Sequence, residues 1–96
     1  MRRAAKVDAN QAEIVRSLRS LGATVQSLAM VGKGCPDILV GYRGTNFLCE
    51  IKDGSKPASA QKLTPHESAW HDSWGGQVVI VRSVDDAIEL LTKHFA

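Results

Sequence analysis

Apolar residues recur at helical spacing near both ends of the chain. Over residues 8–21 they fall at i, i+1, i+4 and i+7, which forms one stripe of a helix. The members of this stripe are Ile14, Val15, Leu18 and Leu21. Asp8 or Asn10 can cap the start of this helix, and Gly22 can cap its end. Near the C-terminus, Ser83 is the predicted cap of a last helix. The expected apolar face of that helix contains Val84, Ile88, Leu91 and Phe95.

A further helix is predicted from its start signal. Thr64 is in the N-cap position, Pro65 occupies the first helical position, and Glu67 completes a capping box. Leu63 precedes the cap and can pack back on the helix as a hydrophobic staple. The glycines at residues 75–76 are expected to end this helix.

Four shorter segments have the apolar, β-branched composition of strands, at residues 23–28, 37–42, 47–52 and 77–82. A tight turn around residues 44–46 is expected to join the second segment to the third. Residues 31–36 form a loop, because two glycines and a proline interrupt any regular period. The resulting order, αβββαβα, predicts an α/β fold in which helices flank a mixed four-stranded sheet.

Two charged residues within one predicted strand need a reason, because the strands of a covered sheet are usually apolar. Glu50 and Lys52 are two positions apart and therefore point to the same face. If the hairpin loop has two or four residues centred on residues 44–45, a residue of the first strand lies opposite the residue of the second strand whose number brings their sum to 89. Asp37 then faces Lys52 and lies diagonally from Glu50. A loop of three or five residues would turn Asp37 to the other face of the sheet.

Two carboxylates and an ammonium group on one face are compatible with two kinds of site. Mg²⁺ binds one or two carboxylates together with water and phosphate oxygens, and a bound cation can activate water for attack on a phosphodiester. Lys52 would then stabilise developing negative charge or help to position the attacking water. The alternative is a structural Asp–Lys–Glu ion-pair cluster at the edge of the sheet, and the spacing alone leaves both open.

Length and composition predict a single globular domain over residues 1–96, with residues 1–7 as a flexible basic arm. Of the 96 residues, 44% are hydrophobic and 23% are charged. No apolar run approaches the roughly 18–20 residues of a membrane-spanning helix, and the basic arm lacks the apolar segment of a secretory signal. We therefore expect no membrane partner. Cys35 and Cys49 are too few for a disulfide framework and are expected to be small buried thiols in a reducing cytoplasm.

Positive charge is concentrated in the first two thirds of the chain. Residues 1–62 contain ten Lys and Arg against five Asp and Glu, whereas residues 63–96 contain two against five. This distribution favours a polyanionic partner. Candidate phosphate contacts, each of which could equally be a solvated surface residue, are Arg2, Arg3, Lys6, Arg16, Arg19, Lys33, Lys56 and Lys62.

Asp37, preceded by Pro36 and followed thirteen positions later by the run Glu50-Ile51-Lys52, resembles the two-part motif of the PD-(D/E)XK nuclease superfamily. A larger set of segments resembles the VRR-NUC branch, the virus-type replication-repair nucleases, in the same order and spacing over nearly the whole chain. These segments are residues 8–21, 32–41, 48–54, 63–65 and 77–83. The predicted αβββαβα order also matches the core of that superfamily.

The resemblance implies roles for the matching residues. Asp37 and Glu50 would be ligands of Mg²⁺ or Mn²⁺, with the backbone carbonyl of Ile51 as a third ligand, and Lys52 would be the catalytic lysine. An acidic residue on the first helix is also common in the family, and Glu13 matches it. Glu13 could hold a second cation or an outer-shell water, and a surface pair with Arg16 is the equally weighted alternative.

One position departs from the family pattern. Related nucleases often have a glutamine just inside the helix that follows the catalytic lysine. This sequence has Glu67 at that place, and the nearby glutamine, Gln61, lies before the helix cap. Glu67 is therefore expected to serve only the capping box, and it is left out of the predicted catalytic set.

Other motifs have simpler explanations. His66 and His71 are five positions apart, which does not match the i, i+4 spacing of a zinc-protease helix, so they and His94 are expected at the surface. Residues 32–34 lack the Walker spacing and precede a strand, so this loop is expected to bring Lys33 and the backbone close to a DNA phosphate. Trp70 and Trp74 are i, i+4 on a helix, for which core packing is the first interpretation, a subunit interface the second and base stacking the third.

Together these features predict a divalent-metal-dependent DNA endonuclease that selects branched DNA, such as a Holliday junction, over a specific sequence. Symmetric cutting of a junction needs two sites, and the small core would gain from a partner, so a homodimer is expected. The expected location is the cytoplasm of a bacterium or of a phage-infected host. The alternatives are a nucleic-acid-binding module without catalysis and a structural dimerisation domain with an ion-pair network.

Overall fold

The structure, a computed structural model, describes residues 9–94; the predicted basic arm, Asp8 and Phe95 lie outside the described residues. Its elements are α1 (Gln11–Ser20), β1 (Thr24–Ser27), β2 (Ile38–Tyr42), β3 (Thr45–Ile51), η1 (Ala58–Gln61), α2 (Pro65–Ser73), β4 (Val78–Val81) and α3 (Val84–His94). The short 3-10 helix η1 was not anticipated from the sequence. The remaining elements follow the predicted αβββαβα order, which confirms the α/β fold.

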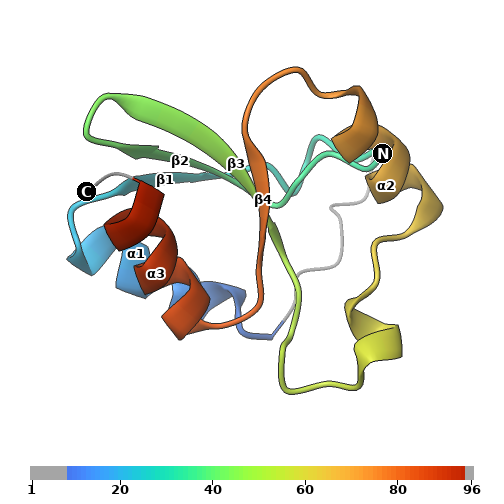
Figure 1. The fold of residues 1–96 in the computed structure, drawn as a ribbon, viewed down its shortest axis with the longest axis horizontal. Coiled ribbons are helices and arrows are strands. Elements are labelled where there is room, and N and C mark those ends of the chain that lie inside the picture. The colour runs from blue at the N-terminus through green and yellow to red at the C-terminus, as the bar shows by residue number, and fades with distance from the viewer. Residues whose placement is uncertain (1–8, 95–96) are drawn as a thin grey trace.

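The four strands form one mixed sheet in the order β1-β2-β3-β4. The β1–β2 and β2–β3 pairs are antiparallel, and β4 runs parallel to β3. Helices α1 and α3 lie together against one face of the sheet, and α2 lies on the other side (Figure 1). No helix within residues 9–94 is both long enough and apolar enough to cross a bilayer.

The hydrophobic core lies between the sheet and the α1–α3 layer. Its fully buried members include Ile14, Leu18, Ile38, Val40 and Cys49. The predicted apolar face of α3 is partly wrong, because Ile88 is 38% exposed whereas Ala87 is fully buried. A small residue at position 87 suits the close packing of α3 against α1, so the buried stripe of α3 passes through Ala87, Leu90 and Leu91.

The ends of α1 are held in different ways. Gly22 has φ +99° and ends the helix as predicted, since this backbone conformation favours glycine. Asn10 occupies the N-cap position, but its side chain does not cap the helix. Its amide nitrogen instead donates to the carbonyl oxygens of Lys52 at 3.1 Å and Arg82 at 3.2 Å. Asn10 therefore ties α1 to the ends of β3 and β4.

The β2–β3 hairpin has a different register from the one predicted. Its two-residue turn consists of Arg43 and Gly44, with φ values of 50° and 81°, and Thr45 already pairs with Tyr42. Two successive residues with positive φ match the right-handed twist of the strands. The parity of the predicted register is correct, but its offset is wrong by two residues. Continuing the observed register by one pair places Asp37 opposite Glu50 instead of opposite Lys52.

Helix α2 begins with the predicted capping box. The Thr64 hydroxyl accepts the Glu67 N–H at 3.2 Å, and the Glu67 carboxylate accepts the Thr64 N–H at 2.8 Å. The loop before β2 packs directly on this first turn. A Cβ added at Gly34, where φ is +82°, would lie 2.3 Å from the carbonyl oxygen of His66.

We expect Gly34→Ala to lower the free energy of unfolding by about 1–3 kcal/mol, because the alanine Cβ would clash with backbone atoms and alanine disfavours the positive φ at this position. Urea unfolding of the two proteins measures the difference. Gly75→Ala is the matched control, since no heavy atom lies within 4 Å of a Cβ at that position. Equal stability of the Gly34→Ala and Gly75→Ala proteins would contradict the packing of this loop on α2.

Candidate active site

Asp37 and Glu50 meet on the face of the sheet that α2 partly covers. The Asp37 carboxyl lies close enough to the carboxyl of Glu50 to raise the pKa of Glu50, and its Oδ2 accepts the backbone N–H of Ile51 at 2.6 Å. Glu50 is only 2% exposed. The structure thus brings together the two predicted carboxylates, and Ile51 contacts Asp37 through its N–H. The role of the Ile51 carbonyl as a third ligand stays a prediction.

Lys52 lies beside this pair and contacts α2. It is 9% exposed, and its Nζ lies 2.8 Å from Oε1 of Glu67. The same oxygen accepts the Thr64 N–H of the capping box. The expectation that Glu67 serves only the capping box is therefore wrong, because one carboxylate both caps α2 and binds the lysine.

His71 is a second α2 residue that contacts the site. Its Nε2 lies 3.4 Å from Oε1 of Glu50, and its side chain is 12% exposed. The prediction of a surface position is wrong for His71, whereas His66 is exposed as expected. Glu67 and His71 are four residues apart on one face of α2, so they reach Lys52, just after the end of β3, and Glu50, two residues before it on β3.

Burial and neighbouring charge perturb the carboxyl groups of the site in opposite directions. Burial, the hydrogen bond to Asp37, and the negative charges of Asp37 and Glu67 together raise the pKa of Glu50 to about 10, although Lys52 acts against them. For Glu67, burial opposes ionisation, but hydrogen bonds from Lys52 and Thr64 and the charge of Lys52 outweigh it and lower the pKa. Glu67 is thus the ionised partner of Lys52, and Glu50 favours its neutral form in the absence of a cation.

A divalent cation fits this donor set. Two carboxyl groups in contact cannot both ionise without a compensating positive charge, and Lys52 already neutralises Glu67. Within residues 9–94, no group of three or more His, Cys, Asp or Glu side chains is arranged to hold a metal. Asp37 and Glu50 would therefore supply two ligands, with water and substrate oxygens as the others, which is a usual arrangement for Mg²⁺.

A cavity of about 540 Å³ opens at Asp37. It is lined by the loop at residues 32–35 and by the first turn of α2, including Glu67. Lys33 also lines this cavity, and its side chain is exposed. Among the predicted phosphate contacts, Lys33 is thus placed where a phosphate bound at Asp37 would lie.

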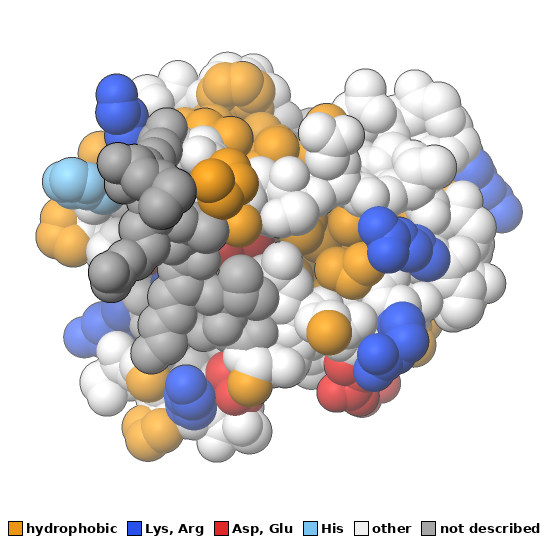
Figure 2. Space-filling model, turned by 180° about the vertical axis from the view of Figure 1, so that it is seen from behind, with side chains coloured by type: hydrophobic (Ala, Val, Ile, Leu, Met, Phe, Trp, Pro, Cys, Tyr) orange, Lys and Arg blue, Asp and Glu red, His pale blue; other side chains and the backbone are white. Residues whose placement is uncertain are grey.

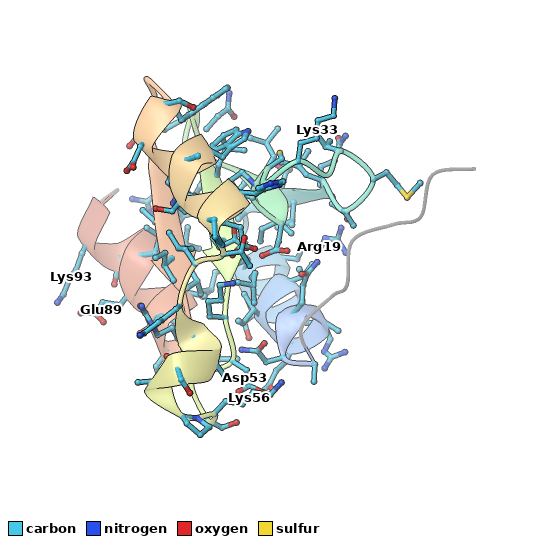
Figure 3. The ribbon with its side chains drawn as sticks, turned by 90° about the vertical axis from the view of Figure 1, so that its right-hand side faces the viewer. Arg19, Lys33, Asp53, Lys56, Glu89 and Lys93 are labelled. Atoms are coloured by element: carbon cyan, nitrogen blue, oxygen red, sulfur yellow. The ribbon has the colours of Figure 1, made fainter. Side chains whose placement is uncertain are left out.

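Within residues 9–94, the other predicted phosphate contacts lie outside this cavity. They are exposed residues of α1 and of the segment that follows β3, namely Arg16, Arg19, Lys56 and Lys62. The Arg19 guanidinium donates to the carbonyl of Val25 at 3.1 Å. In Figure 3, Lys33 and Lys56 lie at opposite ends of the molecule. In Figure 2, lysine and arginine side chains are spread over the visible face instead of forming one patch.

Glu13 does not join Asp37 and Glu50 in the structure. It is exposed and lines another cavity, of about 730 Å³, together with Asp53 and Asp85. It forms no ion pair with Arg16 among those recorded for the described residues. A role for Glu13 in catalysis stays a prediction.

Gln61 and the two cysteines do not supply further chemistry. The Gln61 amide donates to the carbonyl of Lys56 at 2.7 Å and accepts from Arg82 at 3.0 Å, so it holds the segment before α2 in place. Cys35 and Cys49 are both free thiols, and Cys49 is buried as predicted, whereas the prediction of a buried thiol is wrong for Cys35, which is only partly buried. Burial and the carboxylates raise the pKa of Cys35, and burial followed by the charge of Asp37 raises that of Cys49 to about 12.

Core packing is the wrong interpretation for the two tryptophans. Trp70 is half-buried and Trp74 is 47% exposed, and neither belongs to the hydrophobic core. Their indole rings stack on each other, with centroids 4.5 Å apart and an interplanar angle of 17°.

The sequence matches no protein-family model, and no curated protein is significantly similar to it. Among solved structures, one described as a VRR_NUC domain superposes with a TM-score of 0.69 and 27% sequence identity. The match covers 88% of this chain and 92% of that one. The arrangement of elements and this superposition together show that the chain has a VRR-NUC fold.

Proposed function

We propose that this chain is a divalent-metal-dependent DNA endonuclease that acts on branched DNA as a homodimer. The observation that carries the proposal is the contact between Asp37 and Glu50, with Lys52 beside them, on one face of a VRR-NUC sheet. The similarity to a VRR_NUC domain suggests a nuclease, and PD-(D/E)XK-like nucleases usually use divalent metals. Mg²⁺ or Mn²⁺, DNA as substrate and the preference for junctions are parts of the proposal.

Each residue has a physical role in the proposed reaction. Asp37 and Glu50 hold the cation, which when bound polarises a phosphate oxygen and lowers the pKa of water. The Ile51 N–H fixes the orientation of the Asp37 carboxylate. The ammonium group of Lys52 lies where it can stabilise negative charge on the phosphate, and Glu67 limits its movement. Lys33, at the mouth of the same cavity, binds an adjacent phosphate.

Cleavage assays test the proposal directly. Labelled four-way junctions and linear duplexes are incubated with the protein and Mg²⁺ or Mn²⁺, and the products are separated on denaturing gels. We expect junction cleavage that stops in EDTA and is lost in Asp37→Asn. Tight junction binding without product in any divalent metal would instead support the non-catalytic binding module. Cleavage that persists in EDTA would overturn the proposed mechanism.

Thermal melts test the cation site without requiring activity. A cation at a hundred times its Kd stabilises the folded state by about 2.7 kcal/mol, which raises the Tm by about 11–22 °C for a domain of this size. Because the raised pKa of Glu50 makes protons compete with the cation, we expect a larger shift at pH 8.5 than at pH 6. No shift at either pH would favour the structural ion-pair network over the metal site.

The homodimer is proposed because symmetric cutting of a junction needs two active sites. The outer edge of β4 is free in the described part of the chain and has the apolar sequence Val78-Val79-Ile80-Val81, which suits pairing with a second copy. Sedimentation velocity at micromolar concentration would show a dimer, and a monomer that still resolves junctions would contradict this part.

A further inference from the structure

A second cavity lies beside the candidate active site on the same face of the sheet. Its volume is about 520 Å³, within the range of roughly 300–1,000 Å³ that is typical of small-ligand pockets. Leu39 and Leu48 of the sheet form one wall, and Trp70 and Trp74 of α2 form another. None of the described residues that line it carries a charge.

This cavity adjoins the cavity at Asp37, with Cys35 in the lining of both. Leu39 and Leu48 pair directly in the hairpin; Leu39 follows Asp37 by two residues on one strand, and Leu48 precedes Glu50 by two residues on the other. That spacing corresponds to about 6.6 Å along the sheet, comparable to the distance between phosphate and base in one nucleotide.

The tryptophans of the wall are ordered by contacts that leave them outside the core. Trp74 stacks on Trp70, and a Cβ at Gly76 would lie 3.0 Å from Nε1 of Trp74, so both neighbours restrict its indole ring. Trp74 is nevertheless 47% exposed, and α2 contains no buried residue. An ordered apolar wall of this kind, exposed beside a site for chemistry, is typical of a binding surface.

The chemistry of the cavity favours a nucleobase over an aliphatic ligand. Indole rings bind a base by stacking, which is sequence-tolerant because every base has a π-face. Two amide side chains, Asn46 and Gln77, also line the cavity and can donate to or accept from a base edge. The Gln77 amide is held by a 3.2 Å hydrogen bond to the backbone carbonyl of Asn46. A paired base would have to leave its stack at a cost of a few kcal/mol, whereas an unpaired base would not.

We propose that this cavity binds an unpaired nucleobase next to a phosphate at the cation site that Asp37 and Glu50 would form, so that the chain prefers DNA with an unpaired nucleotide at the cleavage position. The inference rests on the proposed nuclease function for the identity of the polymer. It explains why an aromatic pair lies beside the carboxylates, and it makes a branch point with unpaired bases the preferred substrate.

Binding of a fluorescent base tests the inference separately from cleavage. A set of forked duplexes carries a single 2-aminopurine at successive unpaired positions near the branch, and protein is added in EDTA. We expect quenching at one position, because stacking on indole quenches this base. Trp74→Leu should abolish the quenching and weaken binding of the fork by about 5- to 100-fold. A fully paired duplex of the same sequence should bind both proteins alike.

Two controls make the result specific. Ile88→Ala removes an exposed apolar side chain from α3, on the opposite side of the sheet, and should change neither quenching nor affinity. Leu39→Phe fills the cavity from the sheet side and should reduce quenching even if Trp74→Leu fails to fold.

Uniform quenching at all positions, or an unchanged affinity in both cavity variants, would overturn the inference. Neither result would contradict the proposed nuclease function. If Trp74→Leu converts a dimer to a monomer in sedimentation velocity without changing base quenching, the cavity is covered by a second copy and the inference is also wrong. Position-specific quenching without cleavage in any metal would instead support the base site and contradict the proposed nuclease.

Discussion

Replacing Lys52 with methionine should slow junction cleavage by about 10²- to 10³-fold, the usual effect of removing one electrostatic contact from a transition state. Methionine preserves most of the buried stem of the side chain, so the fold is expected to survive. Glu67 would lose its ion partner, but it would keep the hydrogen bond from the Thr64 N–H. Single-turnover cleavage of a labelled junction with saturating Mg²⁺ measures the loss, and circular dichroism checks the fold.

Lys93→Met is the matched control for this substitution. Lys93 pairs with Glu89 on the exposed surface of α3, and its side chain is 70% exposed. Removing this charge should leave the cleavage rate within about two-fold, because exposed ion pairs contribute little. If Lys52→Met cleaved as fast as Lys93→Met, the ammonium group would have no part in the reaction.

Replacing Glu50 with glutamine should make the metal-free protein more stable while it removes both cation binding and cleavage. The pKa of Glu50 is raised from its ordinary 4.5 to about 10. The folded state therefore favours the neutral form of Glu50. The stability that this group contributes is fully present below about pH 4.5 and is lost as the pH rises toward 10. An amide does not ionise and can donate a hydrogen bond to Asp37, so at pH 8 we expect a gain of about 1–3 kcal/mol.

Urea unfolding in EDTA between pH 5 and pH 9 measures this gain. The wild-type protein should lose stability with rising pH, and the Glu50→Gln protein should lose less. In Mg²⁺ the order reverses, because only the wild-type site gains a cation. A Glu50→Gln protein that is less stable than wild type at pH 8 in EDTA would show that Glu50 is not a strained group in the fold.

The sequence predicted the element order because each element carries its own local pattern. The apolar stripe of α1, the capping box at Thr64 and the continuous apolar run of β4 are all short-range signals. The details that failed depend on contacts between elements. The rotation of α3 is set by its packing on α1, and the hairpin offset is set by a turn in which Arg43, a non-glycine residue, adopts a positive φ.

The carboxylates of the candidate site were predictable because parity alone puts Asp37 and Glu50 on one face of the hairpin. The α2 partners were missed because the apolar pattern of that helix does not indicate which side of it faces β3. A signal was nevertheless available. Glu67 and His71 are spaced i, i+4, which places an acid and a histidine on the same helical face. In the structure, the two side chains of this helical face contact Lys52 and Glu50.

The shared oxygen of Glu67 has an evolutionary consequence. One carboxylate starts a helix and restrains the lysine, so under the proposed function selection for folding and selection for turnover would act on the same codon. Alanine at this position fails in both tasks at once, whereas glutamine preserves the helix start and an uncharged contact to the lysine. We therefore expect position 67 to accept glutamate or glutamine and few other residues.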